Sequence, residues 1–480
     1  MPFVFKPRID FHSGYKMRPI ATITAVGILS TSLISAPSAF GLEMPGYGKL
    51  PNPNVESLLG VNKDDQSPSD AGTLTPEEQQ IVDRSPLNSL PLQPQRSAKA
   101  GSLVSREEAQ LMVNDKAWDA TSYRYHYNST DSMERPSVDT ALYIEPNKPW
   151  IGSGQRPVVA IAPGTQGSAE QCDPSISTQK GIEVRFDPID VVAPYEVLPI
   201  IQNLEKGAAV VIMDHHRNSA GNQEYVDNIS SAQSLLDAIT AAKDLGLESG
   251  SPVGIYGYSQ GGSAAAAAAE RAGIYAPDLN VVGTSAGGPP SDLTKVLEQI
   301  DGSSLTAAIA LAINSVLDKD PELRAVIDKE LSDEGRALLD NVGSYCAGGL
   351  GLHHGFETTD QYISSKANLM DIIEKYQPVK RELQRQRIGN FTPNAPVFLY
   401  GGTHDDVIPI NQIRALRDDW TALGADLDYF EDQTPPVLQK TGVNHIAPML
   451  NNLGKASDFL WARFPSQPSL VDKAKAATTK

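Results

Sequence analysis

Continuous apolar runs alternate along much of this chain of 480 residues with segments whose apolar positions recur at helical spacing. A short run without polar alternation indicates a strand that is buried on both faces of a sheet. Such strands are predicted within 156–167, 207–216, 251–262, 279–288 and 395–406. Helices are predicted within 225–246, 261–273, 410–424 and 445–464, and a further strand within 425–432. This order predicts an α/β fold with a mostly parallel central sheet covered by helices on both faces.

Two parts of the chain depart from this alternation. Strand patterns at 121–127 and 140–146 are separated by a polar, Pro-containing segment, which predicts an early antiparallel pair. Between 289 and 390 the pattern is mainly helical. This stretch lies between two core strands, so we expect an inserted cap with both ends at the carboxyl edge of the sheet. The alternative is a set of extra helices that only pack on the core.

The first 41 residues are predicted to be a signal peptide. Lys16 and Arg18 precede an apolar run at 20–36, and the small residues of "PSAFG" follow it. The run is short and rich in Ser and Thr for a bilayer span, so no stable membrane insertion is expected. The protein is therefore expected to be secreted or extracellular, or retained in the cell envelope. Further along, the pattern predicts a Pro/Ser-rich segment at 42–100, core at 101–288 and 391–465, and a polar tail at 466–480.

Charge and cysteine content narrow the partners of the protein. The formal net charge is -18, and phosphate neutralisation needs clustered Lys and Arg, so no nucleic acid is expected as a partner. The chain has two cysteines, Cys172 and Cys346, which excludes a metal site of the Cys-x-x-Cys type. In an exported chain they predict one disulfide, whereas in a cytosolic enzyme they would be two buried thiols. No metal and no cofactor are expected.

Candidate chemistry begins with Ser259. The segment 257–261, "GYSQG", fits G-x-S-x-G and lies where a predicted buried strand turns into a predicted helix. Glycines on both sides of the serine permit a tight turn, which lifts the hydroxyl above the sheet at the N-terminus of a helix. The alternative is an ordinary serine in a Gly-rich turn. The context favours Ser259 as a nucleophile.

A serine nucleophile needs a histidine as base and an acid to orient that histidine. In chains with this strand–turn–helix motif, the acid comes after the serine along the sequence and the histidine after the acid. His445 lies between the last predicted strand and the closing helix, which favours it as the base. "GTHDD" follows the preceding strand and offers Asp405 and Asp406, of which Asp405 is the better candidate and Asp406 is expected to be a solvated neighbour. An oxyanion hole needs backbone N–H donors, predicted at Gln260 and at Thr165 or Gln166 in the loop "APGTQG".

These pieces together resemble the secretory lipases, a family that includes fungal lipase A. The resemblance covers roughly 124–464 and is carried by "APGTQGSAEQCDPS", "GYSQGG", "VVGTSAGGPPSDL", "GTHDDVIP" and "NHIAP". It implies an α/β-hydrolase fold with an inserted helical cap, hydrolysis of acyl esters including triacylglycerols, and Ser259, Asp405 and His445 as the triad. It also implies a disulfide from Cys172, beside the oxyanion loop, to Cys346 in the cap. Fungal members often have an acidic residue where this chain has Gln166, so only the backbone donor carries over.

The sequence thus predicts a secreted serine carboxylic ester hydrolase (EC 3.1.1.-), in particular a triacylglycerol lipase, with a role in lipid catabolism. Its substrate would be an acyl ester or lipid, met at a lipid interface and processed through an acyl-enzyme on Ser259. One alternative is a secreted acyltransferase with the same triad. The other is a non-catalytic cell-surface protein that retains the fold.

The cap is expected to set substrate choice. Its most apolar piece places one set of side chains at helical spacing, which is predicted to pack on the core: Leu305, Ile309, Ile313, Val316 and Leu317. The small residues Ala308 and Ala312 are predicted to line a channel for the acyl chain.

Overall fold

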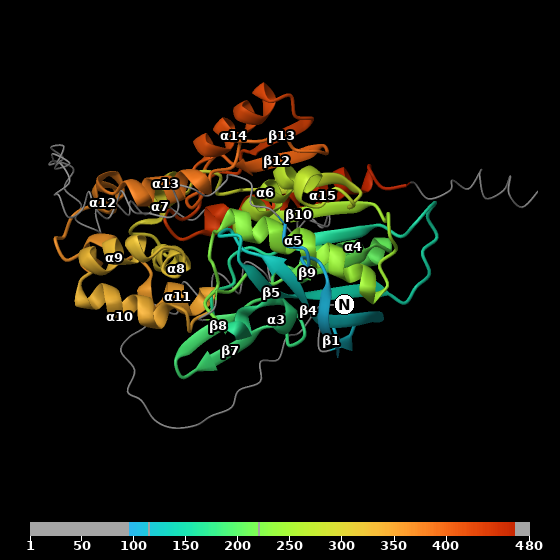
Figure 1. Cartoon of the computed structure of the whole chain (residues 1–480), viewed down its shortest axis with the longest axis horizontal. Coiled ribbons are helices and arrows are strands. Elements are labelled where there is room, and N and C mark those ends of the chain that lie inside the picture. Colours follow the sequence, from blue (N-terminus) through green and yellow to red (C-terminus); the bar gives the residue numbers. More distant parts are fainter. Residues whose placement is uncertain (1–95, 114–115, 219–220, 466–480) are drawn as a thin grey trace, which may run out of the picture.

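A single sheet forms the centre of the protein, whose computed structural model describes residues 96–113, 116–218 and 221–465 (Figure 1). Within these residues the sheet has nine strands in the order β1-β4-β5-β9-β6-β10-β11-β12-β13. The strands from β9 to β13 in that order pair parallel, and β1, β4 and β5 pair antiparallel at one side. Their bounds are β1 (Leu103–Ala109), β4 (Ala120–Thr130), β5 (Pro136–Pro146), β6 (Val158–Ala162), β9 (Ala209–Met213), β10 (Val253–Tyr258), β11 (Val281–Gly287), β12 (Val397–Gly402) and β13 (Leu427–Asp432).

Helices cover both faces of this sheet, which is why its central strands are continuously apolar. Along β6, Val158 and Ala160 pack in the apolar cluster that contains α5 and α6, whereas Val159 and Ile161 pack in the cluster that contains α4 and α15. The helices around the core sheet are α3 (Pro174–Ser177), α4 (Val197–Lys206), α5 (Asn228–Ala242), α6 (Gln260–Tyr275), α14 (Ile410–Ala422) and α15 (Val443–Trp461). The predicted α/β-hydrolase fold and the early antiparallel pair β4–β5 are confirmed.

The mostly exposed edge strand β1 was not anticipated. Five of its seven side chains face solvent, and its sequence "LVSREEA" is accordingly mostly polar. A strand of this kind has no apolar pattern by which it could be predicted. Two small antiparallel pairs complete the strands of the described residues: β2 (Met112–Val113) with β3 (Lys116–Ala117), and β7 (Glu183–Phe186) with β8 (Ile189–Val192). The predicted signal peptide at 1–41, the Pro/Ser-rich segment up to residue 95 and the tail at 466–480 lie outside the described residues.

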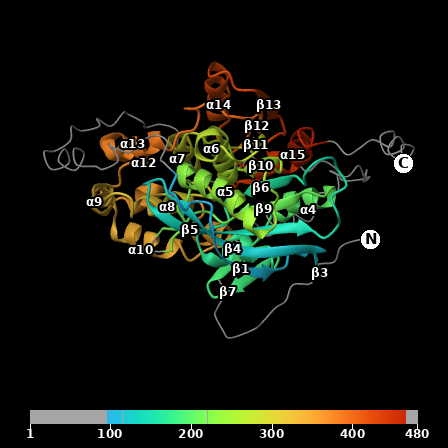
Figure 2. The same ribbon diagram turned by 45° about the vertical axis from the view of Figure 1, so that its right-hand side comes forward.

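A block of helices between β11 and β12 lies to one side of the sheet in both ribbon views (Figures 1 and 2). These cap helices are α7 (Leu293–Ile300), α8 (Ala307–Val316), α9 (Pro321–Glu330), α10 (Asp333–Val342), α11 (Ala347–His354), α12 (Leu369–Lys375) and α13 (Gln377–Arg385). The two ends of the cap meet as expected, since the N–H of Ile388 bonds the carbonyl of Ser291 at 3.0 Å, and the crossing to the next strand follows only after residue 387. Because β11 and β12 are parallel, the chain leaves at the carboxyl edge and must return to the opposite edge.

The return path runs along α6. Buried Glu270 on that helix accepts hydrogen bonds from the backbone N–H of Gly389 at 2.7 Å and from the indole of Trp420 at 2.8 Å. Further along, the N–H of Asn394 bonds the carbonyl of Ala269 at 3.3 Å. The segment 388–396 is therefore part of the core and not of the cap.

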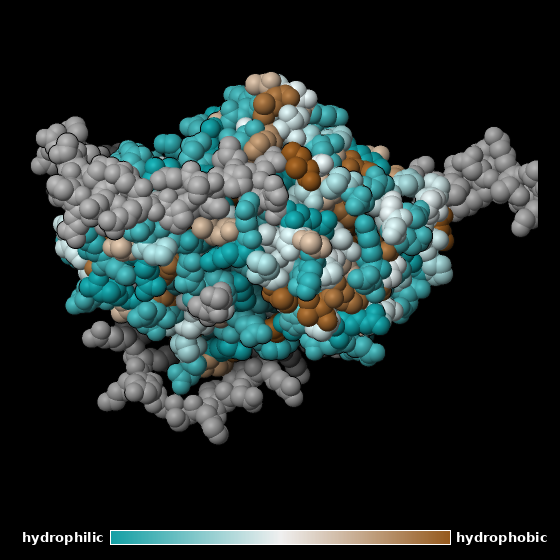
Figure 3. All heavy atoms as spheres, viewed as in Figure 1, coloured by the Kyte–Doolittle hydropathy of each residue, from teal (hydrophilic) through white to brown (hydrophobic). Residues whose placement is uncertain are grey.

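Hydrophilic side chains cover most of the face shown in Figure 3, with apolar ones in scattered groups. None of the helices in the described residues combines the length and apolar character that a membrane span requires.

Candidate active site

Ser259 lies at the turn between β10 and α6, with φ 59° and ψ -125°. Such a positive φ is strained for a serine, and it persists where the surroundings fix it. Both flanking glycines are required because there is no room for a side chain at either position. A Cβ on Gly257 would lie 2.0 Å from the carbonyl oxygen of Gly261, and a Cβ on Gly261 would lie 2.0 Å from that of Ala162. The alanine run that follows in α6 is buried, which lets this helix pack directly on the sheet as expected.

His445 and Asp405 form a buried pair. Nδ1 of His445 lies 2.7 Å from Oδ2 of Asp405, and the other carboxylate oxygen accepts the N–H groups of Val407 at 2.9 Å and Ile408 at 2.8 Å. The aspartate is thus fixed by its own loop and orients the imidazole. Nε2 of His445 has no hydrogen-bond partner among the described residues, so it remains available to a hydroxyl.

Asp406 is not the solvated neighbour that the sequence suggested. It is 2% exposed, and its Oδ2 accepts the N–H groups of Thr441 at 3.0 Å and Gly442 at 3.1 Å. Burial raises its pKa, although these two bonds oppose the shift. Asp406 therefore holds the loop that leads into His445, while Asp405 bonds the imidazole itself.

Tyr258, the residue before the nucleophile, supports the histidine from the other side. Its hydroxyl donates to the backbone carbonyl of His445 at 2.6 Å, and the two rings pack with centroids 5.1 Å apart. The sequence did not predict this role, because any residue can stand at the variable position of G-x-S-x-G, and the motif does not indicate what that residue contacts.

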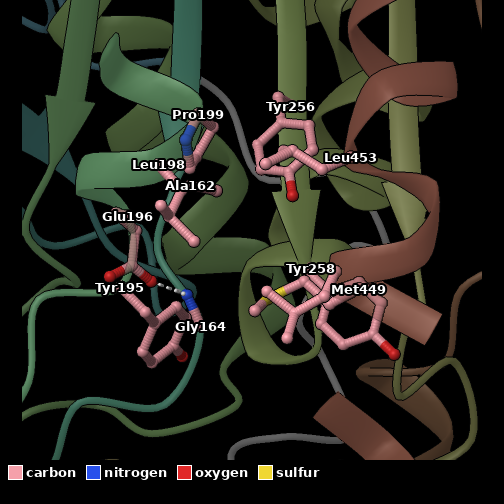
Figure 4. Close-up of a pocket in the computed structure, with 11 residues that line it drawn as sticks. Ala162, Gly164, Tyr195, Glu196, Leu198, Pro199, Tyr256, Tyr258, Met449 and Leu453 are labelled. Atoms are coloured by element: carbon pink, nitrogen blue, oxygen red, sulfur yellow. Dashed lines mark hydrogen bonds between the residues drawn. The ribbon is translucent and has the colours of Figure 1, made fainter. Parts of the chain in front are cut away.

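The side chains of the oxyanion loop are already engaged. Thr165 Oγ1 bonds the hydroxyl of Tyr225 at 2.8 Å, and the amide of Gln166 donates to Glu196. The same carboxylate accepts the N–H of Gly164 at 2.8 Å (Figure 4). What these residues can offer a substrate is therefore their backbone N–H groups, together with that of Gln260 in the first turn of α6.

Glu196 is a buried carboxyl that the sequence did not reveal. It is 3% exposed, and burial raises its pKa to about 8, with the N–H of Gly164 opposing the shift. It lies in a small pocket, drawn in Figure 4, between the oxyanion loop, α4 and α15. Thirty residues separate it from the loop it supports, and no motif marks such a contact.

A disulfide joins Cys172 to Cys346 at the start of α11. Beside it, the N–H of Ala347 bonds the carbonyl of Gln166 at 2.8 Å, and Gly167 forms a β-bridge with Cys346. The oxyanion loop of the core is therefore held directly against a cap helix.

A cavity of about 520 Å³ lies between the core and the cap. One part of it is lined by the candidate catalytic residues Thr165, Gln166, Ser259, Gln260 and His445. One face of α8 and its flanks forms another wall, which comprises Leu305, Ala308, Ala312, Ser315, Val316 and Lys319.

The wall formed by α8 differs in part from the prediction. Ala308 and Ala312 line the cavity as expected, and Ile309 packs in the core cluster. Leu305 and Ile313 pack against the same cluster as expected. Leu305 also lines the cavity, and so does Val316, because they recur with the alanines every three or four residues.

Lys319 anchors the cap side of this cavity to the core. Its ammonium, 1% exposed, contacts Asp227 closely and lies 3.5 Å from Glu382 and 3.9 Å from Glu224. Burial opposes ionisation of both Lys319 and Asp227, but their mutual attraction outweighs it, so the pKa of the lysine is raised and that of the aspartate lowered. A buried ion cluster therefore ties α8 and α13 to the start of α5.

One nearby group has the donor atoms of a metal site. Single ligand atoms of Asp131, His216 and Glu224 lie within 4.8 Å of one another. Arg135, however, contacts Asp131 at 2.6 Å, and Nδ1 of His216 lies 2.7 Å from Asp139. Burial lowers the pKa of His216, but the carboxylates outweigh it and raise the pKa to about 9. The imidazole keeps its proton, so the group is better explained as salt bridges.

Ser259 at a strained strand-to-helix turn lines the same cavity as the His445–Asp405 pair, at a mostly parallel sheet, and this arrangement is typical of an α/β-hydrolase. The model of the secretory lipase family matches residues 183–472, and the chain belongs to this family. The similar structures include Candida antarctica lipase A in its closed state, with a TM-score of 0.64 and 19% identity over 79% of this chain and 87% of that one. This likeness concerns the fold.

Curated relatives of the chain differ in their described activity. A probable inactive lipase of Mycobacterium tuberculosis is 28% identical over 65% of this chain and 68% of that protein. A secreted triacylglycerol lipase of Malassezia globosa is 29% identical over 65% of this chain and 66% of its own length. One from Malassezia furfur is 32% identical over 62% of this chain and 61% of its own length.

Proposed function

We propose that the protein is a secreted serine carboxylic ester hydrolase that acts as a triacylglycerol lipase. The observation that carries this proposal is the cavity into which Ser259 and the Asp405-bonded His445 both open. The family and the names of two relatives favour hydrolysis over acyl transfer to another alcohol. The basic and apolar N-terminal pattern supports export, followed by release or retention in the cell envelope.

Acylation would use each group in a distinct role. Ser259 Oγ attacks the ester carbonyl carbon while His445 Nε2 takes the hydroxyl proton. Asp405 holds the ring in the tautomer that leaves Nε2 free and stabilises the imidazolium. Backbone N–H groups of Gln260 and of Thr165 or Gln166 bind the oxyanion. When the intermediate collapses, the bond to the alcohol breaks and His445 returns the proton to the leaving alcohol.

Deacylation reverses these roles with water in place of the alcohol. His445 deprotonates the water as it attacks the acyl carbon, the bond to Ser259 breaks, and the proton returns to the serine. The apolar wall of the cavity suits an acyl chain, since each buried methylene stabilises the complex by ~0.8 kcal/mol.

A fluorophosphonate probe tests the nucleophile directly. We expect a covalent adduct on the peptide that contains Ser259, and neither an adduct nor ester hydrolysis in folded Ser259→Ala. Ser263→Ala is the matched control one turn along α6, because that hydroxyl donates to the carbonyl of Gln260 and is buried. Because one relative is described as inactive, a folded native protein that neither labels nor hydrolyses esters would instead establish a non-catalytic role.

A further inference from the structure

The β7–β8 hairpin presents an apolar face to solvent. Val184 pairs with Val191 and Phe186 with Ile189, and directly paired residues of antiparallel strands share a face. Ile182 precedes them on the same alternation. The exposed fractions are 48% for Ile182 and Val184, 60% for Phe186 and 50% for Ile189. Four large apolar side chains are thus in contact with water on one short hairpin.

The opposite face of the hairpin attaches it to the protein. Asp190 is buried, and its two carboxylate oxygens accept the N–H groups of Cys346 and Gly349, each at 2.9 Å. Val192 is buried against the disulfide. The hairpin is therefore held through Asp190 and Val192, and within the described part of the chain its apolar face stays exposed.

This apolar face continues into the cavity. Ile182 and Val191 line the cavity, and so do Phe356 and Leu438, which come from other segments. Ile182, Phe356 and Leu438 are also 48%, 54% and 38% exposed. A side chain that both lines a cavity and contacts solvent marks an opening, so these three surround the cavity mouth.

Hydrogen bonds connect the three segments around the mouth. His353 Nε2 lies 2.8 Å from the carbonyl of Ile189, which joins α11 to the hairpin. The N–H of Phe356 bonds the carbonyl of Ser303 at 2.7 Å, and the next residue, Ser304, bonds the carbonyl of Lys440 at 2.8 Å.

The exposed side chains of these segments form a surface that we call the apolar rim. Of the thirteen strongly exposed large apolar side chains in the described part of the chain, the rim holds seven: Ile182, Val184, Phe186, Ile189, Phe356, Val437 and Leu438.

We propose that the apolar rim docks on the surface of uncharged or zwitterionic lipid. An exposed apolar patch of this kind marks an interaction site. Its continuity with the cavity identifies the partner, because an acyl chain that passes from lipid through this mouth stays in apolar surroundings up to Ser259. The net charge of -18 disfavours an anionic surface. This inference rests on the proposed ester substrate.

Sedimentation with phosphatidylcholine vesicles tests the docking, using full-length protein with Ser259→Ala so that no lipid is consumed. Adding Phe186→Ser and Ile189→Ser should lower the partition coefficient roughly 10–100-fold, since two apolar side chains no longer enter the lipid. The matched control is Ile274→Ser with Leu423→Ser, exposed 69% and 43% at the ends of α6 and α14 far from the carboxyl edge. The control should partition like the parent.

Activity gives a second readout in protein that retains Ser259. The hairpin variant should hydrolyse a dissolved short-chain ester normally and emulsified triacylglycerol poorly. Equal vesicle binding by the hairpin and control variants would overturn the proposal. So would loss of a dimer in the hairpin variant with vesicle binding unchanged, because the rim would then bind a second copy. Rim-dependent binding by a protein without esterase activity would uphold the docking and refute the proposed function.

Discussion

The core and the cap position their functional residues by different means. In the core, Ser259 is fixed by a turn that excludes any Cβ on either side, and Asp405 is fixed by two backbone N–H groups. In the cap, the cavity wall is a helix face whose shape depends on side-chain volume at Ala308 and Ala312. We therefore expect abrupt losses from small changes in the core, and graded changes in selectivity from larger changes in the cap.

The largest effect on activity should come from replacing one carboxylate oxygen of Asp405 in the core by an amide nitrogen. Asp405→Asn leaves the geometry intact but favours the wrong imidazole tautomer, so kcat should fall about 10⁴-fold. Asp406→Asn is the matched control, because its amide oxygen can still accept from Thr441 and Gly442. It should cost less than about tenfold. Steady-state hydrolysis of a dissolved ester measures both, and a deeper loss in Asp406→Asn would reverse the assignment of the acid.

Removing the cation that joins the two regions should have the next largest effect. Lys319→Met leaves buried carboxylates without their partner, and the free energy of unfolding should fall by about 3–5 kcal/mol. Lys295→Met removes an exposed cap lysine whose pair with Glu298 lies at the surface, and should cost less than about 0.5 kcal/mol. Urea unfolding compares the two, and similar losses would show that the ion cluster does not hold the cap.

The disulfide is the second link between the regions. It connects residues 174 apart, and Cys172→Ser with Cys346→Ser should lower the free energy of unfolding by about 2–4 kcal/mol. Limited proteolysis should then cut the cap before the core. Simultaneous cleavage of both regions at native rates would indicate that the other contacts suffice.

Glu196 lies where the core loop meets the cap, and it predicts a pH dependence. Because burial raises its pKa to about 8 from 4.5, the folded protein retains a proton that the unfolded chain loses. Its contribution to stability is therefore complete below about pH 4.5 and falls as the pH rises to about 8, by up to ~1.4 kcal/mol per pH unit. Glu196→Gln cannot ionise and should flatten this slope in urea unfolding from pH 5 to 8. If the free energy of unfolding fell with pH equally in Glu196→Gln and in the native protein, the pKa of Glu196 would not be raised.

The smallest and most graded effect is expected in the cap wall. Ala308→Leu with Ala312→Leu should move the preferred acyl chain to shorter lengths, with each excluded methylene costing ~0.8 kcal/mol, or about fourfold in kcat/KM. Ala337→Leu, on the exposed face of α10, is the control. Profiles on esters of rising chain length measure the shift, and unchanged profiles in the folded variant would show that this wall does not meet the acyl chain.

Local patterns in the sequence predicted the core far better than the contacts around it. Continuous apolar strands and the order of Ser259, Asp405 and His445 are local or ordered signals, and the structure places the last two in contact. Asp406 was misjudged because a charged residue after a strand is usually solvated, whereas here the loop of Gly442 covers it.

The features that were missed depend on distant segments or on exposed surfaces. Glu196 supports a loop thirty residues earlier, and the β7–β8 hairpin mixes charged residues with exposed apolar ones. The contact of Glu196 produces no periodic signal. The hairpin does alternate at Ile182, Val184 and Phe186, but alternation alone predicts a buried face, whereas this face contacts solvent. The two cysteines of an exported chain predicted the disulfide, and the helical stretch between two core strands predicted the cap; in each case the family resemblance favoured one of two explanations.

The segment 388–396, which returns along α6 to the start of β12, limits how much of the cap could be exchanged between relatives by engineering. A graft that took the whole stretch between β11 and β12 would also remove Gly389, whose N–H bonds the buried carboxylate of Glu270. That buried carboxylate would then lose one of its donors and keep the indole of Trp420. The transplantable module is therefore 289–387, and the recipient should keep its own residues 388–396. A chimera built on those boundaries should keep Lys319 and Cys346, which join the module to Asp227 and Cys172 of the core, and would then import another protein's selectivity.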